Sequence, residues 1–125
     1  MSKPETITVL VKEPLKSVEI REIPNTLEAK QAIVGGLIEA FPLENKYDIY
    51  VNENGIAERL QPNLLFLPYN VLLGTVFISR LNWEEGTDMG LTQEEIEEVT
   101  KMIRGRAVKT EAEANHYAEQ IKKFM

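Results

Sequence analysis

The stretch NTLEAKQAIVGGLIEAF, residues 25–41, contains the junction on which the fold depends. Asn25 stands three residues before Glu28, which is the spacing of a capping box at the start of a helix. We expect this helix to end at Gly35, because glycine readily adopts the left-handed conformation that commonly closes a helix. The apolar residues that follow predict a strand that Pro42 ends. The junction therefore predicts a helix followed closely by a strand.

Alternating apolar residues predict most of the remaining strands. Residues 6–23 predict a hairpin around EPLKS, and KYDIYV (46–51) predicts a strand with Tyr47, Ile49 and Val51 on one face. Asn54-Gly55 is a strong hairpin signal, so IAERL (56–60) is expected to be the returning strand. QPNLLFLPYN reads as a loop or a short helical turn, and VLLGTVFIS (71–79) as one central strand buried on both faces.

The C-terminal third of the chain is predicted to be helical. Capping-box residues occur at Thr92 with Glu95 and again at Thr110 with Glu113, and Gly105 is expected to end the first helix. The fold class is therefore α+β, a mainly antiparallel sheet with one early helix and a C-terminal helical pair. We expect one core domain over residues 1–108, with a last helix over 109–125 that either packs on the sheet or serves as a homodimer surface.

Composition excludes several classes of protein. A chain of 125 residues with 43% hydrophobic residues is long enough for one folded domain, and the absence of cysteine excludes a disulfide scaffold or a thiol nucleophile. No apolar run reaches the roughly 20 residues of a membrane span, so a cytoplasmic protein with no membrane partner is expected. The net charge of −6 argues against direct nucleic-acid binding, which needs a basic face.

Acidic residues are concentrated in one segment. Residues Glu84–Glu98 include seven carboxylates and no basic residue: Glu84, Glu85, Asp88, Glu94, Glu95, Glu97 and Glu98. One interpretation is a solvated loop followed by the first turns of a helix. The other is a docking surface for a basic protein partner. Trp83, beside Glu84 and Glu85, fits either a partly buried anchor or an interface residue.

No catalytic motif is present in the sequence. The nucleophile elbow, the phosphate-binding loops and the zinc-protease motif are all absent, and the single histidine, His116, falls on the polar side of the last predicted helix. We therefore expect a protein that is not an enzyme and that has neither a cofactor nor a metal site.

Glu39 is the residue of the junction best placed for ligand contact. It is either an exposed strand residue or a carboxylate at the rim of a pocket, close to backbone that Gly36 leaves accessible. Asn52 and Asn63 are the further candidates for this pocket, although Asn63 also fits the cap of a short helical turn. Chain order alone does not place these residues together.

The combination NTLEAKQAIVGGLIEAFPL, VNENG, LQPN and GTVFI resembles the family that carries domain of unknown function 3846, small proteins of firmicutes, their phages and mobile elements. The resemblance covers about residues 7–97 and implies a family pattern at these positions: Gly35, Gly36, Glu39, Asn52, Glu53, Gly55, Asn63, Gly74 and Thr75. It brings no activity, cofactor or catalytic residue. It implies an accessory protein of a mobile element, a context in which inhibitors of host defence are common.

Two functional hypotheses follow, and both are preferred over a third, an enzyme that pairs Glu39 with a second acid such as Asp48 or Glu53. The first is a non-enzymatic protein-binding module that contacts a host or element-encoded protein through the acidic segment. The second is a protein that binds, and so sequesters, a small molecule or nucleotide signal in a pocket near Glu39 and Asn52.

Overall fold

An antiparallel sheet forms the centre of the protein. The computed structural model describes residues 5–66, 70–82, 84 and 86–123. Five strands lie in the order β2-β1-β7-β4-β3, and β8 pairs with the end of β7. Their bounds are β1 Thr6–Lys12, β2 Glu19–Pro24, β3 Ile38–Leu43, β4 Tyr47–Asn52, β7 Val76–Asn82 and β8 Thr87–Met89. All pairings in this sheet are antiparallel, as predicted.

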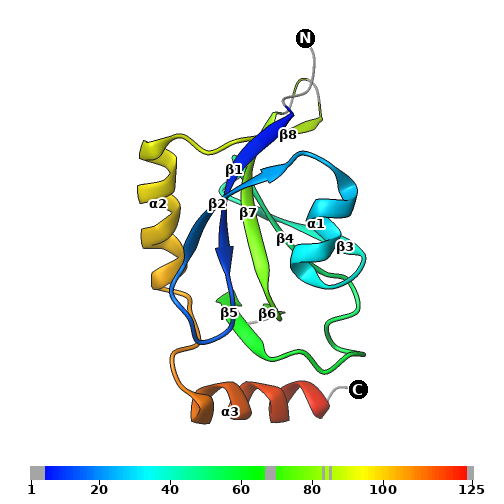
Figure 1. Cartoon of the computed structure of the whole chain (residues 1–125). Coiled ribbons are helices and arrows are strands. Elements are labelled where there is room, and N and C mark those ends of the chain that lie inside the picture. Colours follow the sequence, from blue (N-terminus) through cyan, green and yellow to red (C-terminus); the bar gives the residue numbers. More distant parts are fainter. Residues whose placement is uncertain (1–4, 67–69, 83, 85, 124–125) are drawn as a thin grey trace.

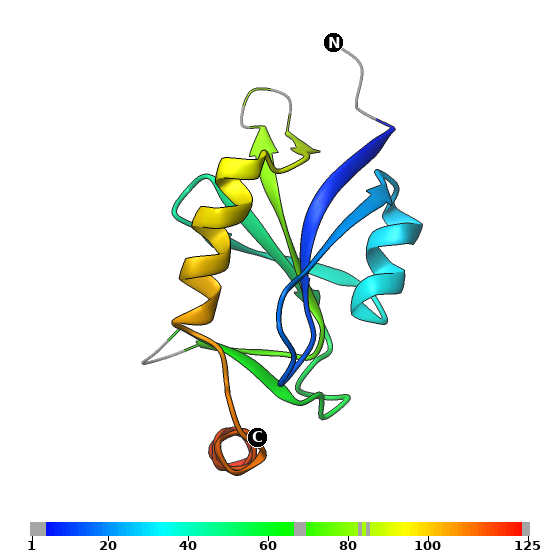
Figure 2. The same ribbon diagram turned by 60° about the vertical axis from the view of Figure 1, so that its left-hand side comes forward.

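One helix covers each face of the sheet (Figures 1 and 2). Helix α1 (Leu27–Val34) lies on one face, and α2 (Gln93–Arg104) lies on the other. A separate two-stranded ribbon of β5 (Pro62–Phe66) and β6 (Asn70–Leu73) lies at one end of the sheet. Helix α3 (Glu111–Lys122) contacts β5 beyond that ribbon. The predicted α+β fold is therefore confirmed.

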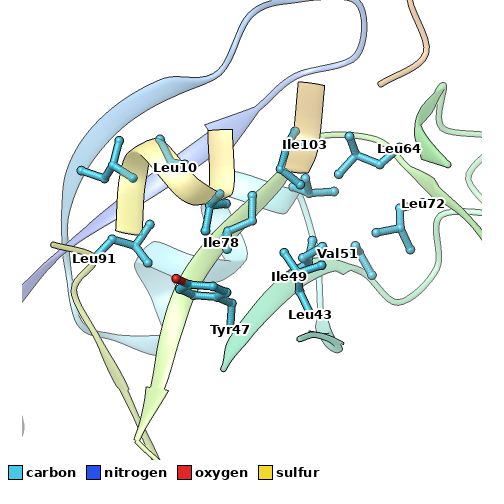
Figure 3. Packing of buried hydrophobic residues seen from close by; sticks show 13 residues of the cluster. Leu10, Leu43, Tyr47, Ile49, Val51, Leu64, Leu72, Ile78, Leu91 and Ile103 are labelled. Atoms are coloured by element: carbon cyan, nitrogen blue, oxygen red, sulfur yellow. The ribbon is translucent and has the colours of Figure 1, made fainter. Parts of the chain in front are cut away.

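Alternation along the central strand β7 builds two separate cores. Phe77 points to the α1 face, where it packs with Val9 and Val34. Its neighbours Val76 and Ile78 point to the α2 face, where the larger core lies (Figure 3). That core includes Leu10, Tyr47, Ile49, Leu64, Leu91, Val99 and Ile103. Because successive strand residues face opposite sides, one strand anchors both helices.

The predicted returning strand over residues 56–60 is wrong. The backbone N–H of Glu58 donates to Asn54 O at 2.8 Å, and that of Leu60 donates to Gly55 O at 2.9 Å, so the chain coils after β4 instead of reversing. The stretch predicted as a loop contains β5, and the single predicted strand over 71–79 divides into β6 and β7 around Gly74. Pro42 also lies inside β3, which tolerates it because β3 is an edge strand.

The helix ends agree closely with the capping signals. Gly35 has φ 79° and closes α1, as expected, but Thr26 rather than Asn25 caps its start, with Thr26 Oγ1 accepting from Ala29 N. The complete capping box of Thr92 and Glu95 is present at α2. Helix α3 contacts β5 of the two-stranded ribbon, and Ala114 is its buried residue. Among the described residues, no helix is long and apolar enough to cross a membrane.

Candidate functional site

Gly36 and Asn52 are in contact at the junction between α1 and β4. The Asn52 side chain is buried, its Nδ2 donates to Val34 O at 3.3 Å, and its Oδ1 accepts from Asn54 N at 2.7 Å. A Cβ atom on Gly36 would lie 2.9 Å from Asn52 Nδ2, so glycine is needed for this approach. Both polar ends of Asn52 are therefore occupied by the backbone of its own chain.

Glu39 and Asn52 line one cavity of about 220 Å³, which we call the Glu39 groove. Glu53 and Gly55 also line it, and both belong to the family pattern that the resemblance implies. Apolar side chains from β3, β4, β6 and the segment after β4 complete the wall: Phe41, Val51, Ile56, Val71, Leu72 and Leu73. Glu39 and Asn52 thus lie at one groove, as the pocket hypothesis requires.

Asn63 does not line the Glu39 groove. It is fully buried, and its Nδ2 donates to Lys12 O and to Gly74 O, both at 2.8 Å. Its Oδ1 accepts from Lys12 Nζ at 3.1 Å. Asn63 lies in β5 rather than at a helix start, so the helix-cap interpretation is wrong and the side chain joins β1, β5 and the turn at Gly74.

Asp88 occupies the centre of a buried polar cluster on the α1 face. Its Oδ2 lies 2.5 Å from Lys30 Nζ, and its Oδ1 accepts from Tyr50 OH at 2.6 Å and from Ser79 Oγ at 3.2 Å. Burial and the Asp88 charge both raise the pKa of the Tyr50 phenol, with burial the larger cause. The cluster joins α1, β4, β7 and β8. Asp88 is therefore a buried residue that holds these elements together, and it is not part of an exposed acidic surface.

Asp48 lies beside this cluster, also buried. Burial, and then repulsion from Asp88, raises the pKa of the Asp48 carboxyl. Within the described part of the chain, the Asp48 carboxylate makes no hydrogen bond and no ion pair. Two carboxylates thus share one buried region, and only Asp88 has a cation.

The other carboxylates of the acidic segment are dispersed. Glu95 is buried, with Oε2 lying 3.7 Å from Lys46 Nζ and 3.5 Å from Arg80 Nε. Glu98 also lies near Lys46 Nζ, at 3.9 Å. Glu84 is exposed, as are Glu94 and Glu97, whereas Trp83 and Glu85 lie outside the described residues.

A second cavity, of about 260 Å³, is lined by four cationic side chains, and we call it the basic pocket. It lies where the β1–β2 turn meets the end of α2 and the connector to α3 (Figure 1). The cationic residues are Lys12, Lys16, Arg104 and Lys109, and no acidic residue is among the described residues that line it. Ser17 and Thr100 supply hydroxyl groups.

Lys12 is the buried member of the basic pocket. The residue is 4% exposed, and its Nζ donates to Glu13 O at 2.8 Å and to Asn63 Oδ1 at 3.1 Å. Burial lowers the pKa of its ammonium group. No carboxylate pairs with it within the described part of the chain. An ammonium group has three N–H donors. Two of those of Lys12 donate to the neutral acceptors Glu13 O and Asn63 Oδ1, and the third has no acceptor in the described structure.

The basic pocket was missed from the sequence, although a signal was there. KEPLK (12–16) and RGRAVK (104–109) are short stretches of basic residues in an otherwise acidic chain. The sequence predicts only a hairpin turn at the first stretch and only the end of a helix, at Gly105, in the second. Their convergence depends on α2 ending beside the β1–β2 turn, which spacing along the chain does not predict.

The fold defines a small α+β domain with one helix on each face of an antiparallel sheet. The chain belongs to the family of the Domain of unknown function (DUF3846), whose sequence profile matches residues 7–104. The resemblance drawn from the sequence is thereby confirmed, and the match extends to the end of α2. Comparison with curated proteins found no match, and comparison with solved structures found none.

Proposed function

We propose that this protein binds a small organic anion in the basic pocket. The observation that carries the proposal is Lys12, a buried ammonium with one N–H donor left over and no carboxylate partner in the described structure. A buried charge without a counter-ion is costly. An anionic oxygen of a ligand at Lys12 would supply the missing partner.

The charge distribution supports the same conclusion. The chain has 14 lysine and arginine residues and a net charge of −6, yet four of its cations line this one pocket. Lys16 has a partner, Glu13, at 3.6 Å, but both side chains of that pair are largely exposed, so the attraction is weak. The pocket is therefore a local region of positive potential on an acidic protein, which favours an anion.

The wall of the pocket indicates what else the ligand carries. Leu15, Val18, Ile103, Ala107 and Val108 give it an apolar surface beside the cations. Such a wall contributes little to binding a bare inorganic ion, whereas it buries an aliphatic or aromatic group. The ligand class is thus a phosphate or carboxylate attached to an apolar group, in line with the small-molecule hypothesis but at a different site from the Glu39 groove.

Protein docking through the acidic segment is the second proposal. Its support comes from the exposed carboxylates of Glu84, Glu94 and Glu97, since Asp88 and Glu95 are buried beside cations. In this second proposal the partner is a protein of the host or of a mobile element, and the binding could inhibit host defence, as the context implied by the family resemblance suggests.

Phenyl phosphate is a suitable probe for the basic pocket, because it joins a phosphate to an apolar ring. We would titrate phenyl phosphate into the full chain and measure the amide chemical shifts by NMR. The shifts of residues around Lys12, Val18 and Val108 are expected to change. The double variant Arg104→Gln/Lys109→Gln changes exposed side chains and should weaken binding about tenfold. The control Lys122→Gln/Lys123→Gln removes the same charge on α3 and should leave affinity unchanged. Equal loss in both variants, or shifts elsewhere, would refute the proposal.

A further inference from the structure

We infer that the Glu39 groove is a docking surface for an extended segment of a partner protein that alternates apolar and basic side chains. The groove lies between the β3–β4 edge of the sheet and strand β6, with Glu39 and Phe41 from β3 and Val71 from β6 among its lining residues. It is separate from the basic pocket, and the two share no lining residue.

Exposed aliphatic side chains extend the groove at one end. Leu37 and Ile56 are each 53% exposed, and they are two of the four large hydrophobic residues that the described structure leaves exposed. Ile56 lines the groove, and the carbonyl of Leu37 accepts from the backbone N–H of Glu53, another lining residue, at 2.9 Å. Ile56 therefore adds exposed apolar surface to the wall of the cavity, as at protein interaction sites, and Leu37 is joined to the lining residue Glu53 through the backbone.

Charge selects the kind of partner. Glu39 and Glu53 are the charged side chains that line the groove, and both are exposed. No ion pair to either is present among the residues that the structure describes. Two carboxylates beside an apolar wall complement lysine or arginine side chains that flank aliphatic ones, and they disfavour an acidic segment.

The adjacent strand explains why the partner is extended. β3 forms the edge of the sheet and pairs only with β4 in the described structure, so its outer backbone groups are not used by another strand. A peptide laid along the first part of this strand, before Pro42, would gain main-chain hydrogen bonds, and its alternate side chains would face the groove. Pro42 has no N–H to donate, so the added pairing would end there. A small organic cation would use the carboxylates but not the strand edge.

A displayed library of random peptides, selected on the full chain, tests the inference directly. We expect enriched sequences to alternate Lys or Arg with aliphatic residues, and amide NMR shifts from a synthetic copy to fall on β3 and on Glu53 to Ile56. The double variant Glu39→Lys/Glu53→Lys reverses both charges of the groove and should weaken binding of that peptide at least about tenfold.

The double variant Glu94→Lys/Glu97→Lys is the matched control, because it reverses two exposed carboxylates on α2 instead. It should bind the peptide like the parent chain. The inference would be overturned by the absence of any enriched sequence, by enriched peptides without basic residues, or by equal binding to the Glu39→Lys/Glu53→Lys variant. Greater loss in the α2 variant would move the docking surface to the acidic segment and would likewise overturn it.

Discussion

Lys30 Nζ lies 2.5 Å from Asp88 Oδ2, and this contact joins helix α1 to strand β8 across 58 positions of the chain. Both side chains are largely buried, at 11% and 6% exposure. Asp88 also accepts from Tyr50 and Ser79, so one carboxylate on β8 contacts side chains from three other elements. A residue that looks like one of seven solvated acids in the sequence is therefore part of the interior.

Removing the cation of this pair should destabilise the protein strongly. Lys30→Met leaves Asp88 buried with only the Tyr50 and Ser79 hydroxyls as donors, at a cost of about 3–5 kcal/mol in the free energy of unfolding. Denaturant unfolding followed by circular dichroism measures it. The double variant Lys30→Met/Asp88→Asn should recover part of the loss, because no unpaired charge then remains at this position. No recovery in the double variant would mean that the contact acts through packing alone.

Asp48 is expected to reduce stability at neutral pH. Because burial raises its pKa, the charged form is disfavoured in the folded state; the penalty starts as pH rises past the ordinary Asp pKa and is complete above the raised pKa. Asp48→Asn should therefore stabilise the protein by about 1 kcal/mol at pH 7. The gain should vanish below the ordinary Asp pKa of about 3.9, where the carboxyl is neutral in both states. Unfolding midpoints across this pH range test the prediction, and a gain independent of pH would contradict it.

Local signals predicted much of the fold. The cap at Gly35, the capping box of Thr92 and Glu95, and the alternation in β4 all depend on neighbours in the sequence, and all three are confirmed. The errors came where long-range contacts decide. Asn54-Gly55 has the composition of a two-residue hairpin, but Gly55 lies against Leu73 and the chain coils there instead.

The sites were harder to predict than the fold for the same reason. Glu39 and Asn52 share a groove because β3 pairs with β4. The sequence predicts both strands but not this pairing. Lys12 and Lys109 meet only after the sheet, α2 and its connector are in place. Whether Asp88 is exposed depends on Lys30, which lies 58 positions away on another element.

Gly36 should not tolerate a side chain. Gly36→Ala would place its Cβ 2.9 Å from Asn52 Nδ2, so the buried amide must move and its bond to Val34 O is strained. We expect a loss of about 1–3 kcal/mol in the free energy of unfolding. Gly105→Ala is the matched control, since its Cβ would meet only ordinary contacts at 3.8 Å and beyond. Adding Asn52→Ala to Gly36→Ala should show a favourable coupling, whereas additive losses would mean that the clash is absent.

Anion binding at the basic pocket should be linked to protonation of Lys12. Burial lowers the pKa of the Lys12 ammonium in the free protein, and an anionic oxygen beside it would raise that pKa again. Binding of phenyl phosphate should then take up protons at alkaline pH, below the ordinary lysine pKa of about 10.4. Calorimetric titrations in buffers of different ionisation enthalpy measure the uptake directly. In Lys12→Met the affinity should fall and the proton uptake should largely disappear, because the buried ammonium group is no longer there. Unchanged proton uptake in that variant would show that Lys12 does not contact the ligand.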